Sequence, residues 1–462
     1  MVLTQEEQKC LDKLSWATQQ LAVEVGEDKL IPIAQIIIES MTGKWRCFHT
    51  PGHVFDVADC GTPIEVLAGL FHDVVYVQVD QGINLNLSYY IAPFIKQVRG
   101  ELIIREQSQC PKDLIFEMVS SIFGFVFGQT LSPVSGQNEF LSALAGAKIL
   151  ESFLPTKIIA RMATCIEATI PFRRNLAEIL YQRLKETNEK FNLGFTEKET
   201  EQTIKNAVRL SNKDVGGFAA PKAVVFLDNT WSLLPETNHK LFSHTSYTIK
   251  EYRSTLEKTE GFLNFLVPEI IFPHFRGEPD AQTYQDLLIR AKHNLEIGRL
   301  YLASKIVTMA LFEAISLRIG KDISLSNLVG ELPSQTETDF RLCNYISIDD
   351  QTKEQPEQTR LEQEVMFLLE QGREQSFVYD IKESPISAFF VKSLGFEKIR
   401  YLRSFATDFF QKRISGEEFI SKYPPEIVER IIEGIVQVMD GRRDRVLTAI
   451  SNQDTSRVSC CY

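Results

Sequence analysis

Residues 62–76 of this 462-residue chain read TPIEVLAGLFHDVVY, a pattern that predicts a buried helix. Thr62 followed by proline, with a glutamate three residues after the threonine, is typical of a helix start with a capping box. Over residues 66–77 every residue is apolar or aromatic except one glycine, His72 and Asp73. Such a helix is buried on most sides. A buried imidazole beside a buried carboxylate is costly unless something compensates it.

The helical period of this segment recurs along most of the chain, whereas the alternation typical of strands is scarce. Further helix starts stand at 196–199 and 415–418, and a proline pair at 424–425 precedes another apolar stripe. We therefore expect an all-α protein. The apolar segments with helical spacing are 11–25, 31–41, 54–58, 64–76, 114–125, 140–153, 158–170 and 287–319.

Composition and charge exclude several classes of protein. Hydrophobic residues make up 44% of the chain, which is typical of a globular protein. The 50 basic and 61 acidic residues give a net charge of -11, which argues against general nucleic-acid binding, so any phosphate group must be held locally. The eight cysteines form no CxxC pair, and the segment MVLTQEEQKCLDKL does not resemble a signal peptide. We expect a cytoplasmic protein with no membrane partner.

The polarity of the chain predicts how it is organised. A polar linker is expected at 346–364, because the sequence there has few residues to bury. Before it we expect a first domain over 1–275 and a long-helix extension over 276–345 that packs on that domain. After it we expect a small helical module over 365–462 with a flexible tail. The apolar stripe at 427–439 predicts core packing or, alternatively, a contact between copies in a homo-oligomer.

Three of the seven histidines fall between residues 49 and 72. His53 stands about three residues into a helix that Thr50 and Pro51 would begin. The positive end of that helix disfavours imidazolium and leaves a nitrogen lone pair for a metal ion. His53, His72 and Asp73 therefore predict a divalent cation, although a hydrogen-bonded core histidine is the simpler interpretation of either histidine taken alone.

A fourth ligand is expected much later in the chain, as a carboxylate. Asp214 is the first candidate, because it ends the amphipathic helix predicted at 196–210 and precedes two glycines that allow close approach. Asp228 is the competitor, because it too is embedded in apolar residues. A helix cap is the alternative role for either carboxylate.

The order of these residues resembles a known signature. His53, then His72-Asp73, then a distant Asp214 resembles the H…HD…D pattern of the HD superfamily of metal-dependent phosphohydrolases. The segments FHTPGH at 48–53 and LFHDVVY at 70–76 are similar to the YHTxxH and WFHDxVY motifs of small bacterial proteins described as predicted HD phosphohydrolases.

A further segment, Asn138-Glu139 with Ser142-Ala143, also resembles that group. The similarity extends over about residues 30–235. It implies an HD-domain helical bundle extended by further helices and by the small C-terminal module.

The resemblance also implies a site with two histidines and two aspartates, here His53, His72, Asp73 and Asp214, on one divalent ion. Mixed nitrogen and oxygen ligands suit Mn, Fe, Co, Zn or Mg. Such an ion polarises a phosphoryl oxygen and lowers the pKa of a bound water. The implied function is hydrolysis of a nucleotide or another small phosphoester.

Further residues are expected to assist. His49, one turn before the first ligand, would contact the phosphate or act as a general acid. Glu167, in an apolar helix, is a candidate for proton transfer or for positioning water. Lys44, Arg46 and Lys213 would bind phosphate oxygens, and solvated surface charge is the equally weighted alternative.

Two other functions compete with the hydrolase. No histidine stands between His72 and His239, whereas the dinuclear branches of the superfamily, including the di-iron oxygenases, use additional histidines in that interval. The site is therefore expected to be mononuclear. Because residues 276–462 exceed what a phosphatase core needs, a non-catalytic or regulatory HD scaffold whose C-terminal helices bind a protein partner is the main alternative.

Overall fold

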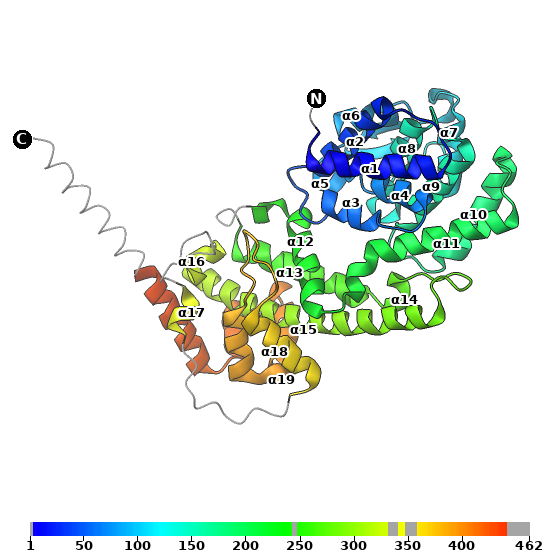
Figure 1. Cartoon of the computed structure of the whole chain (residues 1–462). Helices are drawn as coiled ribbons and strands as arrows, with labels where there is room; N and C mark the ends of the chain where they lie inside the picture. Colours follow the sequence, from blue (N-terminus) through cyan, green and yellow to red (C-terminus); the bar gives the residue numbers. More distant parts are fainter. Residues whose placement is uncertain (1–2, 243–246, 331–340, 347–357, 441–462) are drawn as a thin grey trace, which may run out of the picture. The chain divides into compact units, whose positions relative to one another are not determined.

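The computed structural model describes residues 3–242, 247–330, 341–346 and 358–440. The chain divides into two compact units, one formed by Met1–Ala220 with Leu266–Lys292 and the other by Pro221–Phe265 with His293–Tyr462. Both units are built from helices, and the described residues form one short two-stranded sheet (Figure 1). The predicted all-α class is confirmed.

The first unit packs its helices around α9, which contacts α4, α7, α8, α10 and α11. All but two residues of α8 are buried. The helices are α1 (Gln5–Gln20), α2 (Glu27–Met41), α3 (Pro51–Val57), α4 (Pro63–Phe71), α5 (Val77–Asp80), α6 (Leu85–Ile91), α7 (Leu114–Phe123), α8 (Gln137–Leu150), α9 (Thr156–Ala168), α10 (Leu176–Phe191), α11 (Glu197–Asp214) and α14 (Pro268–Ile271), with 3₁₀ turns η1 (Gln107–Gln109), η2 (Pro133–Ser135) and η3 (Val215–Ala219).

Two glycines allow neighbouring elements to reach the end of α4. A Cβ atom added at Gly69 would lie 2.8 Å from the Cα atom of Ala58, and one added at Gly146 would lie 2.9 Å from the ring of Phe71. Real Cβ atoms essentially never approach other atoms so closely. The close contacts that α3 and α8 make with α4 therefore depend on glycine at both positions.

The predicted helix starts are observed. The Thr62 hydroxyl accepts a hydrogen bond from the backbone N–H of Glu65 at the start of α4, and the Glu65 carboxylate bonds to that hydroxyl rather than to the Thr62 backbone. A complete capping box with Thr196 begins α11. Ser415 caps the short helix α20 (Gly416–Ile420). Each cap satisfies N–H groups that the helix leaves unpaired.

A β-hairpin joins α6 to the turn before α7. Strand β1 (Ile95–Val98) pairs antiparallel with β2 (Glu101–Ile104). Arg99 and Gly100 make the two-residue turn with φ angles of 53° and 90°. Positive φ at both positions suits the right-handed twist of a hairpin.

The second unit is organised around the long helix α15 (Ala281–Ile319), which begins within the first unit. Among the described helices, α15 alone is long and apolar enough to cross a membrane, but 94% of its apolar window is buried in the protein. The other elements are α12 (Ala223–Thr237), η4 (His239–Phe242), α13 (Ile249–Phe265), α16 (Leu325–Val329), α17 (Leu342–Tyr345), α18 (Arg360–Gln371), α19 (Pro385–Phe410), α20 and a helix over 425–440.

The observed division differs from the predicted domain boundaries at 275 and 365. Helices α12 and α13 belong with the C-terminal helices, because buried polar groups join them. The carboxylate of Asp228 on α12 accepts hydrogen bonds from the N–H groups of Glu374 and Gln375. The hydroxyl of Tyr247 donates to the carbonyl of Tyr379. Because these bonds join α12 and α13 to the C-terminal helices, residues 365–440 are part of a larger compact unit. Sequence patterns do not reveal hydrogen bonds between positions so far apart.

The last residues of the linker predicted at 346–364 are helical in the structure. Residues 360–364 begin α18, where Thr359 and Glu362 form a capping box. Residues 347–357 and the predicted tail at 441–462 lie outside the described residues. In the helix over 425–440, Ile431 and Val438 are fully buried, whereas Ile432 and Met439 are 38% and 39% exposed. The buried residues agree with the core-packing interpretation of the apolar stripe, and a contact between copies stays a prediction.

Candidate metal centre

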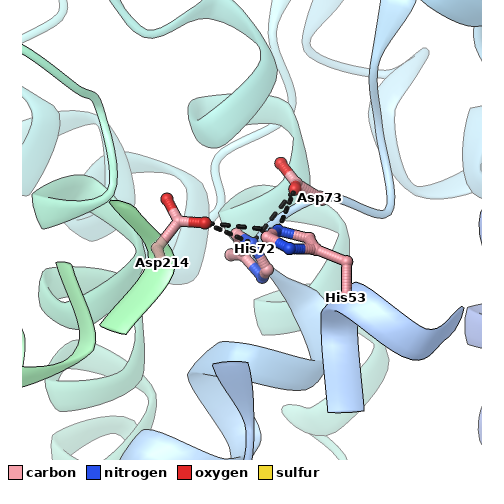
Figure 2. Close-up of side chains that lie close together, drawn as sticks. All are labelled: His53, His72, Asp73 and Asp214. Atoms are coloured by element: carbon pink, nitrogen blue, oxygen red, sulfur yellow. Dashed lines mark ion pairs between the residues drawn. The ribbon is translucent and has the colours of Figure 1, made fainter. Parts of the chain in front are cut away.

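Three segments that are far apart in the sequence bring four side chains together (Figure 2). His53 lies on α3, which begins at Pro51 as predicted. His72 and Asp73 follow the last turn of α4, and Asp214 is the last residue of α11. One ligand atom of each of the four residues lies within 4.8 Å of the others. The structure therefore brings together the four residues predicted as metal ligands.

The two imidazoles lie between the two carboxylates (Figure 2). The Nε2 atom of His53 is 3.4 Å from Oδ2 of Asp73 and 3.2 Å from Oδ1 of Asp214. The Nε2 atom of His72 is 3.0 Å and 3.4 Å from the same two oxygens. At a ligand-to-metal distance of about 2.1 Å, neighbouring ligand atoms are ~3.0 Å apart in an octahedron and ~3.4 Å apart in a tetrahedron. The four separations fit one metal ion.

The hydrogen bonds of the histidines also fit a metal ion. Nδ1 of His72 lies 2.8 Å from the carbonyl oxygen of Gly69, so Nδ1 carries a proton, and Nε2 of the neutral ring would present its lone pair to a metal ion. The Nε2 atoms of His53 and His72 are buried and lack a hydrogen bond of good geometry in the described part of the chain. Two buried lone pairs and two carboxylate oxygens form a donor set that suits Mn, Fe, Co, Zn or Mg.

The charges of the four residues depend on one another. Burial lowers the pKa of His53, but the neighbouring carboxylates of Asp214 and Asp73 outweigh it and raise that pKa to about 9. Burial raises the carboxyl pKa of Asp214, but the two histidines outweigh it and lower that pKa to about 2. In the absence of a metal ion, protons on the histidines balance the carboxylates. A divalent cation would replace these protons, because metal ligation requires neutral imidazole and ionised carboxylate.

Arg46 is placed to support the site rather than to bind phosphate as predicted. Its buried guanidinium donates to both carboxylate oxygens of Asp80, over 3.0 and 2.7 Å. Its Nη1 atom donates to the backbone carbonyl of Asp73 over 2.8 Å. Because these bonds occupy the guanidinium, Arg46 fixes the backbone that presents Asp73.

Helix α8 holds the same segment from another direction. The hydroxyl of Ser142 accepts from the N–H of Val75 over 3.0 Å, and the amide oxygen of Asn138 accepts from the N–H of Val77 over 3.2 Å. Both α8 residues belong to the segment that the sequence singled out. Their role is to fix the chain that follows Asp73.

The predicted lysines lie at the surface. Lys44 is exposed, and its Nζ atom lies 4.4 Å from the centre of the Trp45 ring. Lys213 is exposed and immediately precedes Asp214. Exposure of these lysines is compatible with both predicted roles, binding of a phosphate and a solvated surface charge.

His49 lies beside the cluster, as predicted. Its Nε2 atom is 3.9 Å from Oδ2 of Asp73, and its ring packs edge to face against Tyr76 with 4.7 Å between centroids. The separation from Asp73 exceeds a hydrogen bond. His49 therefore borders the four candidate ligands.

Glu167 has partners that the sequence analysis did not anticipate. Its buried carboxylate accepts two hydrogen bonds from Arg173, over 2.7 and 2.9 Å, and one from Arg183 over 3.0 Å. These hydrogen bonds occupy both carboxylate oxygens of Glu167 and tie them to Arg173 and Arg183. The structure indicates that Glu167 supports the fold.

Glu139 is a partly buried residue of α8, in a segment that the sequence singled out without giving this glutamate a role. Its Oε2 atom lacks a hydrogen-bond partner among the described residues. Burial, helped by the charges of Asp73 and Asp214, raises its pKa to about 8. A group that holds a proton near neutral pH and interacts electrostatically with two of the candidate ligands is a candidate for proton transfer. The sequence signal that could have identified Glu139 is its position next to Asn138, in a segment that carries the family resemblance.

Asp228, the competing fourth ligand, lies outside the cluster. It belongs to the second unit, where two backbone N–H groups donate to its carboxylate. Asp214 alone of the two aspartates joins the histidines.

Comparisons with known proteins give no match: no protein-family model, no curated protein and no solved structure is significantly similar to the chain. The geometry of the four side chains is therefore the main evidence for a function.

Proposed function

We propose that this chain is a metal-dependent phosphohydrolase of the HD type, acting on a nucleotide or another small phosphoester. The observation that carries the proposal is the convergence of His53, His72, Asp73 and Asp214 within 4.8 Å, with two buried histidine nitrogens lacking hydrogen-bond partners in the described part of the chain. The order of the four residues and the motifs around them support the same family.

The four residues would hold one divalent ion, which when bound supplies positive charge for a phosphoryl oxygen and lowers the pKa of a water. The chain's own residues would do the rest. Arg46 keeps the Asp73 backbone in place. His49 borders the candidate ligands and would donate a hydrogen bond to the phosphate or a proton to the leaving group. Glu139 would take the proton-transfer role that the sequence predicted for Glu167.

Elemental analysis coupled to phosphate release from a panel of nucleotides tests the proposal. The matched variants are Asp214→Asn, which removes a ligand, and Asp228→Asn, which changes the competing carboxylate. We expect wild type and Asp228→Asn to carry about one metal ion per chain and to release phosphate. Asp214→Asn should lose both. Equal metal content and turnover in the two variants would contradict the ligand assignment.

A non-catalytic metal scaffold is the second candidate, because four protein ligands are enough to complete the coordination of some metal ions. Four protein ligands complete a tetrahedral zinc site and leave no position for water, whereas a six-coordinate ion keeps two positions open. X-ray absorption spectroscopy of the purified protein distinguishes them. Six-coordination with turnover supports the hydrolase. Four-coordination by protein atoms, without turnover on any phosphoester, supports the scaffold.

A further inference from the structure

The second unit contains a buried cluster of charged groups that the proposed hydrolase does not use. Oδ2 of Asp380 accepts hydrogen bonds from Nζ of Lys305 over 2.9 Å and from Nε1 of Trp231 over 2.7 Å. Nη1 of Arg373 lies 3.3 Å from the same oxygen. All four residues are at most 6% exposed. Burial of ion pairs adds little net stability, so their presence calls for another explanation.

A cavity of about 80 Å³ lies against this cluster. A single water needs roughly 10–15 Å³ of such space, so the cavity holds more than one water-sized group. Part of its wall is apolar and is formed by Met309, Leu325, Val329 and Ile386. An apolar wall beside buried charges suits a small ligand with a polar head and a short apolar body.

The polar part of the wall offers hydrogen-bond donors without acceptors. The Tyr252 side chain is 1% exposed, and its hydroxyl interacts with the Asp380 carboxylate without a hydrogen bond of good geometry among the described residues. Nε of Arg341 is likewise buried and without a partner there. Lys305 donates to Asp380 and Ser384, which uses two of its three N–H bonds. Unfilled buried donors are costly, and an oxygen-rich group would fill them.

Among the described residues, the charges at the wall leave one positive charge unbalanced. Glu383 is paired with Lys382, whose Nζ is 3.5 Å away. Of the charged side chains that line the cavity, this leaves Lys305, Arg341 and the carboxylate of Asp380. Arg373 lies 3.3 Å from the carboxylate of Asp380 and 3.8 Å from that of Asp228, so counting this arginine together with Asp228 leaves the excess at one positive charge. A ligand with one negative charge would balance the cavity.

We propose that this cavity binds a small organic monocarboxylate, with its carboxylate at Tyr252, Lys305 and Arg341 and its apolar chain against Met309 and Leu325. The site lies wholly in the second unit and stands independently of the metal centre and of the proposed hydrolase.

Isothermal titration calorimetry of the full chain with sodium butyrate tests this site. The informative variant is Tyr252→Phe, which removes one hydroxyl and keeps the ring. We expect butyrate to bind once per chain and Tyr252→Phe to weaken binding about tenfold, because the hydroxyl donates to a charged group. The control is Tyr423→Phe, which removes another buried hydroxyl of the same unit that donates to the carbonyl of Val307.

Several outcomes would overturn the proposal. Absence of saturable butyrate binding would do so, as would an unchanged dissociation constant in Tyr252→Phe, which is also the result expected if butyrate binds the metal centre. Equal affinity for butan-1-ol would show that charge plays no part. Tighter binding of inorganic phosphate at this site would show that the apolar wall is not used. A Tyr252→Phe chain that is less stable but binds butyrate normally would mean that the hydroxyl serves the fold alone.

Discussion

Replacing His72 with alanine is expected to remove most of the stability that a metal ion adds to this chain. The His72 side chain is 1% exposed, and its Nε2 atom is one of the four ligand atoms. Tight sites with four ligands bind metal with ~10–16 kcal/mol, so one ligand accounts for ~3 kcal/mol, or roughly a hundredfold in affinity.

The expected size of the effect follows from mass action. At a metal concentration about 100 times its dissociation constant, the wild-type chain gains ~2.7 kcal/mol. At that concentration a variant with hundredfold weaker binding gains only about 0.4 kcal/mol. For a domain of this size 1 kcal/mol shifts the Tm by roughly 2–4 °C. Metal should therefore raise the Tm by about 5–10 °C in the wild type and by about 1 °C in His72→Ala.

Circular dichroism melts of metal-stripped protein, with and without added Mn²⁺ or Zn²⁺, measure this difference. His293→Ala is the control, because His293 is 45% exposed and pairs with Glu364 in the second unit. The control should keep the full metal-dependent rise. If His72→Ala also kept it, the metal would bind elsewhere and the reasoning from the four side chains would fail.

Three further results are expected. Arg46→Met should weaken metal binding about 10- to 100-fold in a chelator competition assay, because it frees the backbone of Asp73, and an unchanged affinity would refute this supporting role. Glu167→Gln should lower the free energy of unfolding by about 1–3 kcal/mol in urea melts without changing metal affinity, and a loss of turnover in fully folded protein would restore its catalytic role. Burial raises the pKa of Asp380, but Lys305 and Arg373 outweigh it and lower that pKa. Its contribution to the free energy of unfolding should therefore be present above about pH 4 and be lost as the pH falls further. Asp380→Asn should make the free energy of unfolding from urea melts less dependent on pH in that range. An unchanged pH dependence would contradict this.

The sequence predicted those features that depend on neighbouring residues. The helices follow from apolar spacing, and the starts of α4 and α11 follow from Thr62 and Thr196. His53 and His72-Asp73 stood out because polar groups interrupt apolar segments. These signals lie within a few residues of one another, and so the class of fold and three of the four clustered residues could be predicted locally.

Features that depend on distant contacts could not be predicted in the same way. Glu167 resembled a catalytic carboxylate until Arg183, on the next helix, was seen to bind it. Arg46 resembled a phosphate ligand because its partner Asp80 lies 34 residues further along the chain. The grouping of residues 221–265 with the C-terminal helices likewise depends on hydrogen bonds that join positions more than 100 residues apart.

The choice between the two aspartates shows what the structure adds. Asp228 stands among apolar residues, whereas Asp214 ends an amphipathic helix. Of the two, Asp228 is the one that receives hydrogen bonds from backbone N–H groups among the described residues. Asp214 ends α11, where the negative end of the helix dipole disfavours a carboxylate, and it shares two histidines with Asp73. A carboxylate in that position needs a positive partner. The imidazoles supply it when protonated, and a divalent cation would supply it when they are neutral.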